Sequence, residues 1–121
     1  MYYFSFEKLE AWKEARVLTN KIYKITKVFP DEEKYGLTNQ LRRAIISVCS
    51  NLAEGSSRTH SKEQTQFYQI AFSSLMEALN QIIISFDLEY LDQQLYNILR
   101  TDAEKCSRLI NSLRNSILKN G

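Results

Sequence analysis

Apolar residues recur every three or four positions along most of the chain, and this spacing predicts helices rather than strands. Four such segments separate, at Phe6 to Val28, Tyr35 to Gly55, Lys62 to Glu89 and Gln93 to Leu118. Each carries its apolar residues on one stripe and most of its charged residues elsewhere. Because the connections are short, successive helices are predicted to run antiparallel. The pattern predicts an all-α fold, an up-down-up-down antiparallel four-helix bundle, with residues 1–121 forming a single domain.

Residues that typically begin or end helices mark the three connections. Pro30 ends the first segment, because proline disfavours helical geometry in the residue before it. Gly55 is predicted to follow the last residue of the second helix, a common place for glycine. Ser61, with Gln64 three residues later, matches a capping box at the start of the third helix. Asp92 is predicted to cap the fourth helix.

Composition agrees with this architecture, since the chain has one proline and three glycines. Its 16 basic and 14 acidic residues give a net charge of +2, which by itself does not indicate nucleic acid. Cys49 and Cys106 lie far apart inside predicted helices, so we expect reduced thiols rather than a disulfide framework. No apolar run of about 18 residues is present, and residues 1–10 do not resemble a signal peptide. We therefore expect a cytoplasmic protein without membrane contact.

The residues that could act in catalysis lack the neighbouring acids, bases or metal ligands that an active site requires. A metal site needs several ligands at suitable spacing, and His60 is the one histidine. Glu54 has no nearby acid, base or metal ligand, which makes a weak active site. We interpret Asn51, Glu54 and Gly55 as a structural turn, braced by a pair between Glu54 and Arg58 or a neighbouring arginine. The sequence therefore predicts no catalytic residue, no metal, no cofactor and no enzyme.

Five basic residues gather on the first predicted helix, opposite its apolar stripe: Lys13, Arg16, Lys21, Lys24 and Lys27. They span about 20 Å at 1.5 Å per residue. Such rows bind nucleic acid because neutralised phosphates release counterions. Glu10 and Glu14 lie near the row and can pair with its lysines, so a solvated helix face remains the alternative. Arg42 and Arg43 are predicted on the outer surface of the second helix, where they contact phosphate or form an intersubunit salt bridge, with a simple surface pair as the alternative. A nucleic-acid contact is also predicted for Arg58.

Several large residues lie outside the apolar stripes or at their edges. Exposed apolar residues on neighbouring helices form patches that mark partners, and Trp and Tyr are frequent interface anchors. We therefore predict self-association. The predicted interface residues are Trp12, Tyr23, Ile46 and Ile84. An assembly of identical subunits would also multiply a weak basic patch.

The most distinctive sequence lies in the segment YGLTNQLRRAIISVCSNLAEGSSR and, after it, in Glu63, Phe67, Tyr68, Ile70, Ala71, Ser74, Leu75 and Glu77. The same pattern includes, upstream, Phe6, Leu9, Trp12, Ala15, Phe29 and Pro30. Over roughly residues 4–92 the chain resembles the bacterial four-helix-bundle proteins encoded in intervening sequences of 23S rRNA. It departs at Cys49, where small residues or proline are usual, and at Ser57, where glycine is common.

The resemblance implies a ring-shaped homopentamer. It also implies a link to nucleic acid, since a related branch accompanies diversity-generating retroelements and is associated with nucleic-acid binding through basic surfaces. The sequence therefore favours a non-enzymatic oligomeric bundle that binds nucleic acid, RNA or else DNA, through basic helix faces. The alternative is a structural or protein-interaction scaffold without nucleic acid. A ribonuclease that uses His60 is a distant third, because helical ribonucleases with an Arg-His motif place that histidine within a helix.

Overall fold

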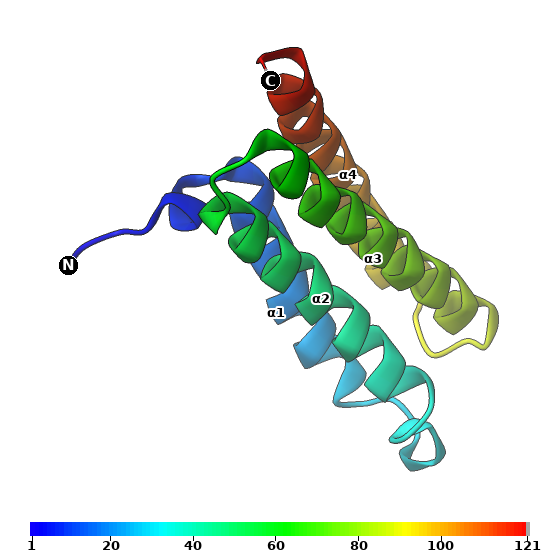
Figure 1. Cartoon of the computed structure of the whole chain (residues 1–121). Helices are drawn as coiled ribbons and strands as arrows, with labels where there is room; N and C mark the ends of the chain where they lie inside the picture. Colours follow the sequence, from blue (N-terminus) through cyan, green and yellow to red (C-terminus); the bar gives the residue numbers. More distant parts are fainter. Residues whose placement is uncertain (121) are drawn as a thin grey trace.

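The structure is a computed structural model that describes residues 1–120, in which four α-helices form one bundle (Figure 1). The helices are α1 Glu10–Thr26, α2 Leu37–Ser57, α3 Ser61–Asp87 and α4 Gln93–Asn120, with two short 3-10 helices, η1 Ser5–Lys8 and η2 Asp31–Glu33. Each helix contacts its neighbours in sequence, and α1 also contacts α4. The described residues contain no strand. The predicted all-α, up-down-up-down four-helix bundle is confirmed.

The core consists of the apolar stripes that the sequence predicted. Its largest fully buried side chains include Leu18, Ile22, Leu41, Ile45, Val48, Leu52, Tyr68, Leu75, Ile82, Leu99 and Ile110. Burying one such side chain stabilises the fold by roughly 1.5–3 kcal/mol. No helix within residues 1–120 is long and apolar enough to cross a membrane.

The first helix begins later than predicted. Residues Ser5–Lys8 form η1, and α1 begins at Glu10, because the backbone of Leu9 is extended (φ −71°, ψ 126°). The ring of Phe6 packs edge-on against Trp12, with 5.0 Å between the ring centroids. The predicted helical turn at Phe6 is thus replaced by a short 3-10 helix that covers Trp12.

Gly55 does not end α2, so that prediction is wrong. The helix continues to Ser57, and Gly55 is a buried residue at the contact with α3. A Cβ atom on Gly55 would lie 2.6 Å from Cε1 of Tyr68 and 2.9 Å from Cβ of Phe67. The glycine allows α2 and α3 to approach closely, and the sequence pattern alone does not distinguish this role from a helix end.

The two predicted caps have different outcomes. Ser61 is the first residue of α3, and no side chain caps this helix, so the predicted capping box is wrong. Gln64 instead donates from Nε2 to the carbonyl oxygen of Arg58 at 3.0 Å, which holds the α2–α3 connection. The cap at Asp92 is confirmed, because the backbone N–H of Leu95 donates to its Oδ1 at 2.8 Å.

α3 ends at Asp87, two residues before its predicted end. Glu89 has a positive φ of 65°, the left-handed conformation in which glycine is usual. The N–H of Tyr90 donates to the carbonyl of Ser85 at 2.9 Å, and the N–H of Glu89 donates to Phe86 at 3.0 Å. These two bonds close the helix although the residue there is not glycine.

The α1–α2 and α3–α4 connections lie at the same end of the bundle (Figure 1). One residue joins them, because Oε1 of Glu33 accepts from the N–H of Leu37 at 3.1 Å and Oε2 accepts from the hydroxyl of Tyr90 at 2.9 Å. Phe29 packs on the same tyrosine, with 5.3 Å between ring centroids. These contacts hold the α1–α2 connection and the start of α2 against the α3–α4 connection.

Candidate nucleic-acid interface

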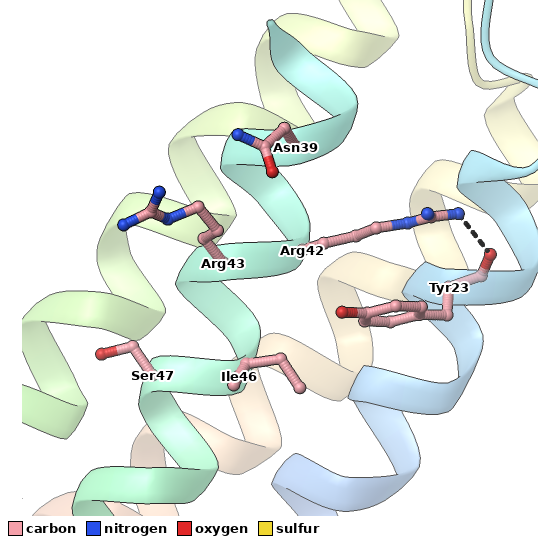
Figure 2. Close-up of a pocket in the computed structure, with 6 residues that line it drawn as sticks. All are labelled: Tyr23, Asn39, Arg42, Arg43, Ile46 and Ser47. Atoms are coloured by element: carbon pink, nitrogen blue, oxygen red, sulfur yellow. Dashed lines mark hydrogen bonds between the residues drawn. The ribbon is translucent and has the colours of Figure 1, made fainter. Parts of the chain in front are cut away.

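Arg42 joins α1 to α2. Its Nε donates to Oγ1 of Thr26 at 2.9 Å. Its Nη2 donates to the carbonyl oxygen of Tyr23 at 3.3 Å, the bond that Figure 2 shows as a dashed line. Its Cζ lies 4.6 Å from the centroid of the Tyr23 ring. Because Tyr23 and Thr26 are three residues apart on one face of α1, a single guanidinium reaches both. The direction of Arg42 is therefore fixed by three contacts.

A hollow of about 520 Å³ lies beside Arg42. We call it the Arg42–Arg43 hollow, and its lining residues are Tyr23, Asn39, Arg42, Arg43, Ile46 and Ser47. Arg42 extends from α2 toward α1, whereas Arg43 extends from the opposite side of α2, and Ile46 lies one turn further along the helix (Figure 2). The hollow thus combines two guanidinium groups with one aromatic and one aliphatic side chain.

A second hollow, of about 270 Å³, adjoins the first and shares Arg42 with it. We call it the Lys27–Lys34 hollow, and its lining residues are Thr26, Lys27, Phe29, Pro30, Asp31, Lys34, Thr38 and Arg42. Asp31 is the one acidic residue that lines either hollow. The two hollows together make a basic surface along the seam between α1 and α2, which we call the α1–α2 seam.

The basic row predicted on α1 is divided by the structure. Lys21 forms an ion pair with Asp102 of α4 at 2.6 Å, and Lys13 pairs with Glu10 at 3.4 Å. The guanidinium of Arg16 lies 5.4 Å from the centroid of the Trp12 ring and forms no ion pair within the described residues. Part of the row is therefore occupied by ion pairs, as the alternative of a solvated, paired face allowed.

Three predicted basic residues near the α1–α2 seam are exposed and have no acidic partner. Lys24, Lys27 and Arg43 form no ion pair within the described part of the chain. Lys34, which the sequence pattern did not single out, is also exposed and unpaired there. The three acidic residues that precede Lys34 in the sequence make this segment acidic overall. In the structure, one of them, Glu33, accepts a hydrogen bond from Tyr90 and does not pair with Lys34.

Arg58 and the predicted turn lie at the other end of α2. The guanidinium of Arg58 lies 4.9 Å from the ring centroid of Phe67, and Glu54 forms no ion pair with Arg58 or any other residue in 1–120. Asn51 donates to the carbonyl of Ser47 at 2.8 Å within α2. The predicted brace by Glu54 is therefore replaced by the close helix contact and the Gln64 bond described above.

The residues predicted at an oligomer interface lie in three separate places. Tyr23 and Ile46, 37% and 43% exposed, both line the Arg42–Arg43 hollow. Trp12 is half-buried against Phe6, and Ile84, 39% exposed, lies on α3. The structure thus brings Tyr23 and Ile46 together with the two arginines, rather than with the other predicted interface residues.

Neither cysteine is placed for nucleophilic chemistry. Burial raises the pKa of the Cys106 thiol to about 12 and also raises the pKa of Cys49, although a hydrogen bond with Thr19 opposes the latter shift. Both thiols are free, and thiolate is the reactive form. His60 is exposed in the α2–α3 connection. Within residues 1–120, no group of three His, Cys, Asp or Glu residues is placed to hold a metal ion.

Comparison with known proteins places the chain in a family. The family model described as 23S rRNA-intervening sequence protein matches residues 7–112. The chain belongs to this family. The match includes the whole α1–α2 seam and most of α4, a helix that the sequence resemblance did not cover. A comparison with curated proteins finds no match.

The fold of this 23S rRNA-intervening sequence family protein is also similar to a crystal structure. That protein, of unknown function, is from the S23 ribosomal protein family of Bacteroides thetaiotaomicron. The TM-score is 0.79 at 15% sequence identity, over 86% of this chain and 97% of that chain. At this identity the similarity shows the fold alone.

Proposed function

We propose that this member of the 23S rRNA-intervening sequence family is a non-enzymatic, homo-oligomeric protein that binds RNA along the α1–α2 seam. The observation that carries the proposal is the set of unpaired cations that line the two hollows, Lys27, Lys34 and Arg43, beside the fixed guanidinium of Arg42. Lys24, the exposed neighbour of Tyr23 in sequence and also unpaired within residues 1–120, adds a further charge on α1. Phosphates bind such cations by direct contact and by release of counterions. The two hollows give the strand a defined place along the seam.

The distribution of charge over the helices supports the same surface. α3 carries one lysine against the three acidic residues Glu63, Glu77 and Asp87, whereas basic residues outnumber acidic ones on both α1 and α4. The two acidic residues of α1 are paired, Glu10 with Lys13 and Glu14 with Lys105 at 3.4 Å. A polyanion is therefore attracted to the side of the bundle formed by α1 and α4 and repelled from α3.

Self-association supports binding by multiplying the seam. Ile70 and Ile84 lie on α3, 49% and 39% exposed, and fourteen residues apart, which is about four helical turns and puts them on one face. Covering them with a second copy would remove apolar surface from water and leave the α1–α2 seam free. The resemblance to ring-shaped homopentamers makes five copies the expected number.

A protein-interaction scaffold without nucleic acid is the second candidate. Tyr23 and Ile46 are the features that favour it, because partly exposed aromatic and aliphatic side chains beside arginines are common at protein interfaces. A protein partner would have to bring acidic groups to Arg43 and Lys27. This alternative predicts no RNA binding at any salt concentration.

The test is an RNA titration followed by fluorescence anisotropy at low salt. Lys24→Glu/Lys27→Glu should weaken binding at least about tenfold, since two cations near phosphate are replaced by anions. The control Lys62→Glu/Lys119→Glu changes the net charge equally on α3 and at the end of α4, and should bind nearly as the wild type does. Wild-type protein that binds no RNA, or two double variants that weaken binding equally, would refute the proposal.

A further inference from the structure

The Arg42–Arg43 hollow has the composition of a site for a flat, anionic ligand. Tyr23 and Ile46 are partly exposed and offer apolar surface, and the two arginines offer positive charge without an acidic residue in the lining. Its volume of about 520 Å³ lies within the range typical of small-molecule sites. A ligand that joins a planar heterocycle to a phosphate satisfies both features.

The contact between Arg42 and Tyr23 forms a preset platform. The guanidinium uses Nε and Nη2 for the two bonds to α1, so it is held against the phenol ring before any ligand arrives. Unpaired bases stack on aromatic rings and on guanidinium planes. Because bases in a duplex already stack on one another, only an unpaired nucleotide can use this platform.

Asn39 adds a group that can recognise the edge of a base. Its side chain makes no hydrogen bond within residues 1–120, so its amide is free both to donate and to accept. Ser47 is less available, because it shares bonds of 2.8 Å with Ser74 and 3.1 Å with Asn51. Asn39 therefore supplies the lining with a side-chain amide that is free to form directional bonds with a heterocycle.

Cationic side chains on either side of the platform are placed to bind the phosphates of the strand that carries the base. Arg43 is exposed on one side of the hollow, and beyond Arg42 the adjoining hollow presents Lys27 and Lys34. A nucleotide seated at Tyr23 would direct one flanking phosphate toward Arg43 and the next toward the two lysines. The order of groups is thus phosphate, base, phosphate along the α1–α2 seam.

From this arrangement we infer that the Arg42–Arg43 hollow binds one unpaired nucleotide of an RNA strand. The base stacks on Tyr23 and Arg42, Asn39 contacts its edge, and Arg43 with Lys27 and Lys34 binds the flanking phosphates. The inference rests on the proposed RNA binding and adds a preference for single-stranded over double-stranded RNA. It gives the seam a means to distinguish an RNA loop or end from a helix.

The experiment compares a single-stranded RNA of about twelve nucleotides with the same strand in a duplex. The single strand carries one fluorescent 2-aminopurine. Tyr23→Leu removes the ring but leaves the backbone carbonyl that holds Arg42, whereas Tyr23→Phe keeps the ring. The matched control is Tyr3→Leu, since Tyr3 is 58% exposed and precedes η1. Circular dichroism checks that each variant keeps its helices.

Wild-type protein should bind the single strand more tightly and change the 2-aminopurine fluorescence. Tyr23→Leu should weaken that binding about 5- to 150-fold, the range expected when one base no longer stacks, and remove the fluorescence change. Tyr23→Phe and Tyr3→Leu should retain both, and duplex binding should be the same in all four proteins. Asn39→Ala should weaken single-strand binding by a factor that depends on which base the RNA presents.

Two results would overturn the inference while the proposed function stands. In the first, the wild type binds the single strand and the duplex equally. Tyr23→Leu leaves this binding unchanged, whereas Lys24→Glu/Lys27→Glu abolishes it. The other is an oligomer that Ile46→Asp dissociates without changing RNA binding, which would assign the hollow to a second copy of the chain. Wild-type protein that binds neither RNA refutes the proposed function, and the nucleotide site with it.

Discussion

Replacing Gly55 by alanine tests how closely α2 and α3 approach each other. Alanine is the better helix former, so a solvent-exposed glycine inside a helix gains about 1 kcal/mol on this change. Gly55 is buried, and the added Cβ would lie 2.6 Å from Cε1 of Tyr68 and 2.9 Å from Cβ of Phe67. The ring of Tyr68 can shift, but the Cβ of Phe67 moves only with the α3 backbone.

The expected magnitude follows from these two opposing effects. Adding a methyl group to a packed interior costs about 1–3 kcal/mol, and the upper end applies here because a backbone-bound atom blocks the space. Subtracting the gain of about 1 kcal/mol in helix propensity leaves a net destabilisation of about 2 kcal/mol. For a domain of this size that change lowers the melting temperature by roughly 8 °C.

Thermal and urea denaturation followed by circular dichroism measure this change directly. Glu54→Ala is the control, because Glu54 is the exposed residue before Gly55 on the same helix and its replacement should change the melting temperature little. A Gly55→Ala protein that is more stable than the wild type would show that helix propensity outweighs packing here. That result would refute the assigned close contact between α2 and α3.

Further predictions concern a helix end, the cysteines and self-association. Glu89→Gly should raise the free energy of unfolding by about 1 kcal/mol, because glycine adopts a positive φ without steric cost, and thermal denaturation measures it. The thiol of Cys106, with its pKa raised to about 12, should resist labelling by a disulfide reagent until the protein unfolds. Since that pKa is higher in the folded state, its contribution to stability should be complete below about pH 9 and decline as the pH rises toward 12, as urea denaturation across this range would show. Ile84→Asp should reduce the mass measured by light scattering toward the 14.2 kDa of one chain while helicity persists, and an unchanged mass would contradict a role in assembly.

Much of the fold followed from local patterns. The buried rows on α1, α2 and α3 were visible as apolar stripes, and the cap at Asp92 was visible as a local preference. Gly55 was misread because a glycine inside a helix and a glycine after its end have the same local signature. The difference depends on Tyr68, which lies on another helix.

The candidate site was less predictable, because ion pairs across helices decide which charges remain free. Lys21 belonged to the predicted basic row, but its partner Asp102 is distant in sequence and meets it only through the packing of α1 on α4. Arg42 was assigned to the outer surface, and its turn toward α1 depends on Thr26 and Tyr23. Lys34 was not predicted as a binding residue, because the three acidic residues before it give the segment a net negative charge.

The salt dependence of RNA binding tests the central claim most directly. The logarithm of the association constant is measured against the logarithm of salt concentration for the wild type, for Lys24→Glu/Lys27→Glu and for Lys62→Glu/Lys119→Glu. Binding along the α1–α2 seam predicts a steep slope for the wild type, and this slope should fall by about 0.7 for each phosphate that the first variant no longer neutralises. The second variant should keep the wild-type slope. A slope that is the same in all three proteins, or no measurable binding at low salt, would contradict the claim that this surface binds RNA.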